Sequence, residues 1–456
     1  MNYRFLTGSA AIALLVGLAA ATSARADDPA PPAHPMLGIV QFSGDVSVGT
    51  TFNPGSPKNN INYGQLFNDR ANSFGMNQAQ VTAEKDLDPA ATGMDWGFKF
   101  EPMYGTDARL THSYTVFDRA TNSPYQWDIV EANGSFHLPV IVSGGIDTKI
   151  GTYSTPIGYE VINANGNFFD THSYIFNYGI PLKHTGLIST AHVTSVIDIW
   201  AGIDTGVNAW LPTRGGDNNK SPSVLVGFGL NNLLDGNLTV LALAHIGPEN
   251  GYIEGQRYTA GSGTAGSYTN GAGQLQDPNK HAREIYDIVT SYKIGDAITT
   301  ALELNVIHDD LGVTNTASRL TNHSGATAEG AALYGTYKLN DMLTFGAREE
   351  VFRDDQGFFV SSEMSSQGAV NAARGIPAQV GLLANGKATY NSLTLGVNYT
   401  PPFTLPYSLG LLLRPEARWD HAFGTPGNTK VFNSSATATG TSNDQFLLSL
   451  NAVLSF

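Results

Sequence analysis

The sequence contains no cysteine, and several other features of ordinary soluble proteins are scarce in it. Disulfides, zinc–thiolate sites and thiol redox chemistry are therefore excluded, so stability must come from burial and from closed networks of backbone hydrogen bonds. Charged residues make up only 14% of the chain, with 25 Lys and Arg against 39 Asp and Glu. This acidic balance disfavours nucleic acid as a partner, because phosphates need a basic face.

Long apolar runs are also rare. The run at 10–21 follows Arg4 and precedes the small-x-small triplet 24–26, an order typical of a secretory signal peptide. We expect residues 1–26 to be cleaved and 27–35 to form a short periplasmic linker; removing the two leader arginines leaves a net charge of −16. No later stretch resembles a transmembrane helix of about 20 residues, so a membrane location would leave only a closed β-barrel.

Residues 36–456 break into segments in which apolar and polar side chains alternate with a period of two. Each is close to the 9–11 residues, roughly, that a tilted strand needs to cross a bilayer. The pattern predicts strands at 36–50, 75–87, 92–104, 127–138, 142–153, 184–194, 195–207, 221–231, 237–247, 282–294, 297–308, 328–339, 342–354, 388–400, 407–420 and 445–456. The count could be 14 to 18, because the assignment of 110–118 and 173–179 as further strands stays open.

Long and short connections alternate along the whole chain. Short links such as 295–296 follow long ones such as 248–281. Outer-membrane barrels have this arrangement, with tight periplasmic turns and large external loops. The sequence therefore predicts an all-β protein: a closed antiparallel transmembrane β-barrel of about 16 strands in the bacterial outer membrane. Its outer face would contact membrane lipid and lipopolysaccharide.

The final segment carries apolar side chains at alternate positions and ends in Phe456. Such a strand resembles the signal read by the barrel-assembly machinery. We expect that machinery to be a partner, and we expect the signal to comprise Leu448, Leu450, Leu454 and Phe456.

The long link 154–183 is rich in aromatic residues, which would be costly in a loop exposed to solvent. We expect it to fold inward and to narrow the lumen through Tyr159, Glu160, Asp170 and Tyr174. Its acids would face basic wall groups, and opposed charges across a constriction create a transverse field. The expected basic partners are Lys99, Lys149, Arg348, Arg414 and Arg418. The alternative is an external lid unrelated to conductance.

Charged side chains recur on one face of many predicted strands, which suits a water-filled lumen of a barrel with 16–18 strands. The predicted lumen charges are Asp95, Lys99, Glu101, Glu131, Asp147, Lys149, Asp198, Asp204, Arg348, Arg414, Glu416, Arg418 and Asp420. Acids outnumber bases among the wall residues, so we expect a weak preference for cations or neutral solutes.

Several short stretches resemble the putative β-barrel porin-2 (OmpL-like) family. They are TPIGYE at 155–160, HSYIFN at 172–177, PLKHTG at 181–186 and WDIVEA at 127–132, together with the Phe456 end. The resemblance covers about 90–210 most strongly. It implies an outer-membrane barrel that conducts small hydrophilic solutes by passive diffusion.

Two other functions remain open: a plugged structural or adhesive barrel, and a barrel enzyme built around His137 or His245. No serine-centred nucleophile motif surrounds either histidine, so we expect no catalysis, cofactor or metal. The acids at 309–310 and 354–355 could bind calcium at the external rim, but solvated acids at that rim are the favoured explanation. Trimers are common among large porins, so a homotrimer is also open.

Overall fold

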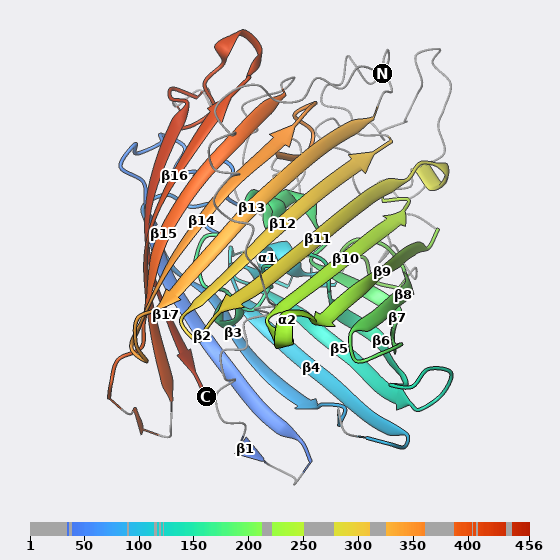
Figure 1. The fold of residues 1–456 in the computed structure, drawn as a ribbon. Coiled ribbons are helices and arrows are strands. Elements are labelled where there is room, and N and C mark those ends of the chain that lie inside the picture. Colours follow the sequence, from blue (N-terminus) through green and yellow to red (C-terminus); the bar gives the residue numbers. More distant parts are fainter. Residues whose placement is uncertain are drawn as a thin grey trace.

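The computed structural model describes residues 34–35, 39–88, 91–113, 116–117, 120–121, 123–211, 221–249, 278–310, 325–360, 387–403, 405–406, 409–434 and 440–456. Within these residues, sixteen long strands, β2 to β17, pair antiparallel in sequence order. β17 pairs with β2, which closes the ring (Figure 1). The predicted closed barrel of sixteen strands is confirmed.

The strands lie close to the predicted segments. Their bounds are β1 His34–Pro35, β2 Gln41–Phe52, β3 Ser73–Lys85, β4 Asp95–Gly105, β5 Gln126–Leu138, β6 Ile146–Ser154, β7 Lys183–His192, β8 Ile197–Asp204, β9 Ser223–Asn232, β10 Leu238–Gly247, β11 Arg283–Ile294, β12 Ile298–Asp309, β13 Ala326–Lys338, β14 Leu343–Asp354, β15 Ala388–Tyr399, β16 Gly410–Phe423 and β17 Asp444–Ser455. The helical turns are α1 Ala108–Thr111, η2 Ala164–Gly166, η3 Ile175–Gly179, α2 Leu233–Gly236, η6 Pro278–Lys280 and η9 Pro426–Asn428.

The described residues of the two segments left open as further strands form helical turns and bends, not strands. Leu110 lies in α1, and 175–179 forms the π-helical turn η3. Because each strand from β2 to β17 already pairs on both sides, the ring offers no edge to either segment. None of the helices in the described part of the chain is long and apolar enough to cross a membrane.

The start of the barrel differs slightly from the expectation. The first long strand begins at Gln41, and the two-residue β1 within the predicted linker pairs with β2 through His34 and Phe42. The predicted signal peptide, residues 1–26, lies outside the described residues, as do most of the loops 248–281 and 355–387. Cleavage after residue 26 therefore stays a prediction.

Long and short connections lie at opposite ends of the barrel. Links such as 295–297 and the turn α2 form one end, and links such as 155–182 form the other. Figure 1 shows α2 and the C-terminal end at the same side of the barrel. We call these the short-turn end and the long-loop end.

Side chains alternate between the two faces of the wall. On β8, Ile199 and Ile203 are exposed on the outer face, whereas Asp204 on the inner face is buried. On β17 the predicted assembly residues Leu448, Leu450 and Leu454 are exposed on the outside. The backbone of the terminal Phe456 pairs with Gly44 of β2 through N–O distances of 3.0 and 3.2 Å. An apolar exterior and a charged interior follow from this alternation.

The densest apolar packing lies inside the ring rather than between the wall and an outer layer. Tyr174 stacks on Tyr390 of β15 with ring centroids 4.9 Å apart, and Phe67 packs against Phe176 at 5.4 Å. These rings come from links at the long-loop end and from the wall. Figure 1 shows α1 enclosed by the strands. Part of the lumen is therefore filled by folded loops.

Candidate pore and inner loop

Residues 155–182, here called the inner loop, connect β6 to β7 and fold into the barrel. Tyr174 and Ile175 are fully buried, and η3 packs against β12 and β13. Gly158 adopts a φ of +92°, and a Cβ atom there would lie 2.6 Å from Ile180 Cδ1. This turn needs glycine, because an L side chain would meet both backbone strain and a clash. The loop lies inside the barrel, where the aromatic-rich sequence places it.

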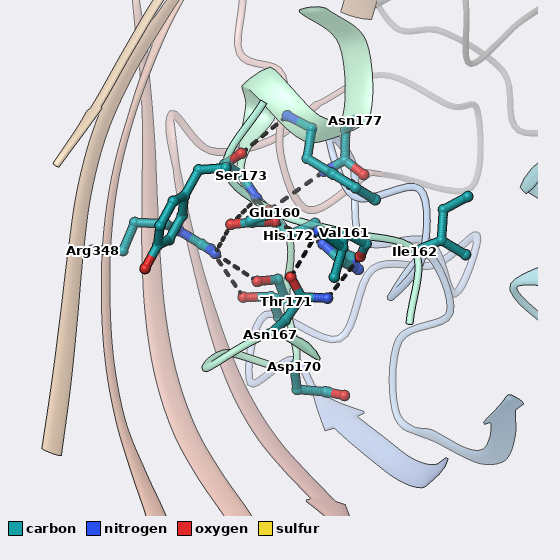
Figure 2. Close-up of polar contacts among 12 residues, drawn as sticks. Glu160, Val161, Ile162, Asn167, Asp170, Thr171, His172, Ser173, Asn177 and Arg348 are labelled. Carbon is teal, nitrogen blue, oxygen red and sulfur yellow. Dashed lines mark hydrogen bonds and ion pairs between the residues drawn. The ribbon is translucent and has the colours of Figure 1, made fainter. Parts of the chain in front are cut away.

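Glu160 is the centre of the loop's contact with the wall. Its carboxylate accepts hydrogen bonds from Arg348 Nη1 at 2.8 Å and from the Ser173 N–H at 3.1 Å, and it lies 2.7 Å from His172 Nδ1. Figure 2 shows Arg348 reaching from the wall toward both Glu160 and Thr171. Arg348 Nη1 also donates to the Thr171 carbonyl at 2.7 Å. One wall arginine thus fixes two separate points of the loop.

Glu160 is ionised in this setting. Burial alone would raise its pKa, but Arg348 and the hydrogen bonds from His172 and Ser173 outweigh burial and lower the pKa to about 2. The negative charge is therefore held at neutral pH and directly neutralised by the arginine.

Two further wall arginines donate to loop carbonyls. Arg418 Nη1 donates to the His172 carbonyl at 2.8 Å. Arg414 Nη1 donates to the carbonyls of Ala164 and Asn167, each at 2.7 Å. The inner loop has little regular structure of its own, so its buried carbonyls need such partners.

Wall carboxylates satisfy the loop's N–H groups in the same way. Glu303 accepts from the Tyr159 N–H at 3.1 Å, and Glu350 accepts from the Tyr174 N–H at 2.6 Å. Glu416 accepts from the Asp170 N–H at 2.8 Å. Charged side chains of the wall thus replace the backbone partners that a strand or helix would supply.

Glycines in the wall make room for the loop's apolar side chains. A Cβ atom at Gly346 on β14 would lie 2.1 Å from the Phe168 ring, and one at Gly330 on β13 would lie 2.5 Å from Ile175 Cγ1. The backbone of the loop can approach these strands closely only because both positions lack a side chain.

The remaining predicted loop residues have other partners. Asp170 points away from the Glu160 group in Figure 2 and accepts from Asn68 Nδ2 at 3.0 Å and from Ser449. The Tyr159 ring packs on Tyr334 with centroids 4.3 Å apart. The arrangement differs from the expected one: Glu160 and Arg348 touch directly, so they do not oppose each other across open water.

Eight of the predicted lumen charges are buried in the described structure. Besides those above, Glu101 accepts from Thr82 Oγ1 at 2.8 Å, and Glu131 accepts from the Ser154 N–H at 3.0 Å. Buried, paired charges cannot act on a passing solute as exposed ones do. The eight are Glu101, Glu131, Asp204, Arg348, Arg414, Glu416, Arg418 and Asp420.

The other five predicted lumen charges stay partly exposed on β4, β6 and β8. Asp95 lies at the start of β4 and pairs with Lys85 at 3.0 Å. The side chains of Lys99 and Asp147 are 34% and 36% exposed. Four of these charges and His192, which the sequence did not indicate, form what we call the wet wall. Its residues are Lys99, Asp147, Lys149, His192 and Asp198.

His192 links two acids of the wet wall. Its Nε2 lies 3.2 Å from Asp147, and its Nδ1 lies 2.8 Å from Asp198. His137, a catalytic candidate from the sequence, also contacts Asp147, at 2.6 Å. The inward parity of His192 in the segment 184–194 was the signal that could have identified it. The contacts make a chain of hydrogen bonds along the wall.

The acids considered for a calcium rim include two that are not solvated. Asp309 is fully buried and accepts from Arg283 Nε at 2.9 Å. Asp354 is also buried and accepts from the Phe358 and Val360 N–H groups, each at 3.0 Å. These acids stabilise the ends of β12 and β14.

A closed barrel that is apolar outside and charged inside, with one loop folded into its lumen, defines the class of outer-membrane porins. This chain belongs to the family described as "Putative beta-barrel porin-2, OmpL-like", whose model matches residues 39–456. The protein is accordingly a porin, a diffusion channel of the bacterial outer membrane.

Solved structures share the fold at low sequence identity. OprB of Pseudomonas putida is 11% identical with a TM-score of 0.52, over 91% of this chain and 94% of that one. The outer membrane channel DcaP of Acinetobacter baumannii is 12% identical with a TM-score of 0.51, over 91% and 97%. No curated protein matches the chain.

Proposed function

We propose that small hydrophilic solutes diffuse passively through the space between the inner loop and the wet wall, without catalysis or a cofactor. The observation that carries this proposal is the difference between the two sides of the lumen. Arg348, Arg414 and Arg418 on β14 and β16 are buried beneath the inner loop, whereas Lys99, Asp147 and Asp198 on β4, β6 and β8 keep partly exposed side chains. The inner loop narrows the passage, and the long-loop end faces outward from the cell.

Selectivity in this proposal depends only on the charges that remain exposed. On the inner face of β3 to β8, the partly exposed acids Glu84, Asp95, Asp147 and Asp198 outnumber Lys99 and Lys149. The resulting field favours cations or neutral solutes weakly, because exposed charges in water are screened.

Conductance of the refolded protein in a planar bilayer tests the proposal. We expect stepwise channel openings, and a reversal potential in a potassium chloride gradient that indicates a modest cation preference. Protein that is folded, as judged by heat-modifiable migration, yet never conducts would favour a plugged structural barrel. A clear anion preference would contradict the selectivity part alone.

We also propose that copies of this chain associate, as a homotrimer, through the side formed by β6 to β9. These strands have 8 to 10 residues, and β8 has only 8, fewer than the roughly 9–11 that span a bilayer. Their outer faces carry exposed apolar side chains such as Ile199 and Phe228. A second copy would cover this shorter apolar belt. Ile199→Arg, which places a charge in the proposed interface, should convert the trimer to monomers in size-exclusion chromatography, and Ala347→Arg on the exposed face of β14 should not.

The outer face and the last strand suggest the remaining partners. We propose that lipid and lipopolysaccharide contact the apolar belt and that the barrel-assembly machinery reads Leu448, Leu450, Leu454 and Phe456. Phe456→Ala should slow membrane assembly in cells, while Phe423→Ala, at an exposed position on the outer face of β16, should not.

A further inference from the structure

Three side chains that the proposed conduction does not use meet inside the ring at the long-loop end. His184 lies near the start of β7, Asp204 at the end of β8, and His245 near the end of β10. All three are buried, and the two imidazole rings lie 4.8 Å apart. Long-range strand pairing, rather than sequence proximity, brings them together.

The polar atoms of this group converge on the Asp204 carboxylate. His184 Nδ1 lies 3.2 Å from Oδ2, and His245 Nε2 lies 3.1 Å from Oδ1. One ligand atom from each residue falls within 4.8 Å of the others. A tetrahedral ion with bonds of about 2.0–2.2 Å holds its ligand atoms roughly 3.4 Å apart, so the most widely separated ligand atoms of this group would approach by about 1.4 Å on binding the ion.

The hydrogen bonding of the group is incomplete. His184 Nδ1 is fully buried and makes no hydrogen bond with any described residue, although it faces a carboxylate oxygen. Beside it, the buried Tyr153 hydroxyl also lacks a hydrogen-bond partner within the described chain, and the Tyr153 ring packs on His184. Buried polar atoms without partners are costly. An ion between His184 and Asp204 would satisfy the imidazole nitrogen.

The ring nitrogen of His184 that faces away from Asp204 has a support typical of a metal ligand. His184 Nε2 contacts Thr155 Oγ1 at 2.9 Å. His245 Nδ1 lies 3.9 Å from Glu249, beyond hydrogen-bond distance, and no described residue hydrogen-bonds this nitrogen. Glu249 instead accepts from Ser223 Oγ and the Val207 N–H, each at 2.8 Å. A metal-bound histidine usually presents its other ring nitrogen to such a hydroxyl or carboxylate, which fixes the tautomer.

We propose that His184, Asp204 and His245 bind one divalent transition metal ion of the zinc class. Two imidazoles and one carboxylate suit such an ion, whereas calcium prefers oxygen ligands alone. Three protein ligands leave a fourth position for water. The ion would join β7, β8 and β10 and, through Thr155, hold the first residue of the inner loop.

The competing explanation is a metal-free network in which one imidazolium pairs with Asp204. To separate the two, tag-free protein is refolded with cobalt(II), freed of excess ion, and examined by elemental analysis and visible absorption. We expect one cobalt per chain with the intense absorption of a four-coordinate site, and loss of that absorption on adding zinc.

Matched variants locate the ion. Asp204→Asn and His245→Gln remove one ligand each but keep a polar side chain of similar size, and each should weaken cobalt binding at least about tenfold. Thr155→Val removes the hydroxyl that contacts His184 and should weaken cobalt binding by about tenfold. His421→Gln is the control, because His421 also pairs with an aspartate, Asp444 at 2.9 Å, but lies outside the group. Folded wild-type protein that retains no cobalt, or an Asp204→Asn variant that binds it as tightly as wild type, would overturn the proposal in favour of the metal-free network.

Discussion

The Arg348 guanidinium donates to the Glu160 carboxylate at 2.8 Å, although the two residues are 188 positions apart in the chain, and neither side chain is appreciably exposed. Arg348 belongs to the wall strand β14 and Glu160 to the inner loop. The contact therefore couples the position of the loop to the barrel itself.

Arg348→Ala should release the inner loop. Removing one partner leaves Glu160 as an unpaired buried charge, which costs about 3–5 kcal/mol. We expect faster limited proteolysis within 155–182 and a larger, noisier single-channel conductance. Arg353→Ala is the control, because its pair with Asp355 is exposed and contributes about 0–1 kcal/mol. Equal proteolysis in the two variants would show that this pair does not hold the loop.

Docking of the inner loop should weaken in acid. Because the pKa of Glu160 is lowered to about 2 from an ordinary value of 4.5, its ionised form favours the docked loop. This stabilisation is complete above about pH 4.5 and is lost as the pH falls toward 2. Proteolysis of the loop by pepsin should therefore accelerate across this window. In Glu160→Gln the cleavage rate should already be high at pH 4.5. A wild-type cleavage rate that follows the same pH dependence as that of Glu160→Gln would refute the pairing.

Gly346→Ala should disturb the loop from the wall side. The added methyl group would lie 2.1 Å from the Phe168 ring, so the ring must move. Overpacking of this kind costs about 1–3 kcal/mol. We expect the same loop release as in Arg348→Ala, measured by proteolysis. Gly335→Ala on the neighbouring strand is the matched control, since nothing lies within 4 Å of a Cβ atom there.

Charge changes on the wet wall should shift ion selectivity in opposite directions. Asp147→Asn removes a partly exposed negative charge and should lower the cation-to-anion permeability ratio, whereas Lys149→Gln should raise it. Each effect should shrink at high salt through screening. Reversal potentials measure the ratio. Asp341→Asn on an exposed short turn should leave it unchanged. If both wall variants behave like this control, solutes do not pass along the wet wall.

The strands and the two ends of the barrel were predictable because they depend on residues that are close together in the sequence. Period-two alternation sets which face of a strand is apolar, and the alternation of loop lengths sets the two ends, so residues such as Ile199 and Asp204 fell on the correct faces. The ends of β2 and β16 were less accurate, because strand ends depend on where the neighbouring strand offers a partner.

The interior was predicted only in part. Composition indicated that the loop around Tyr174 packs inward, but not that Arg348, Arg414 and Arg418 would be buried beneath it. That outcome depends on contacts between strands and loop separated by about half of the chain. The same holds for His245, which alternation places inside the barrel but which only strand pairing brings to His184.

In the proposed conduction path, the docked loop and the wet wall have separate tasks. Along this proposed path, the inner loop limits the width of the passage, and the residues of the wet wall meet the permeating ions. In a nanopore sensor built on this barrel, substitutions at Lys99 or Asp147 would therefore change ion selectivity without changing the width of the pore.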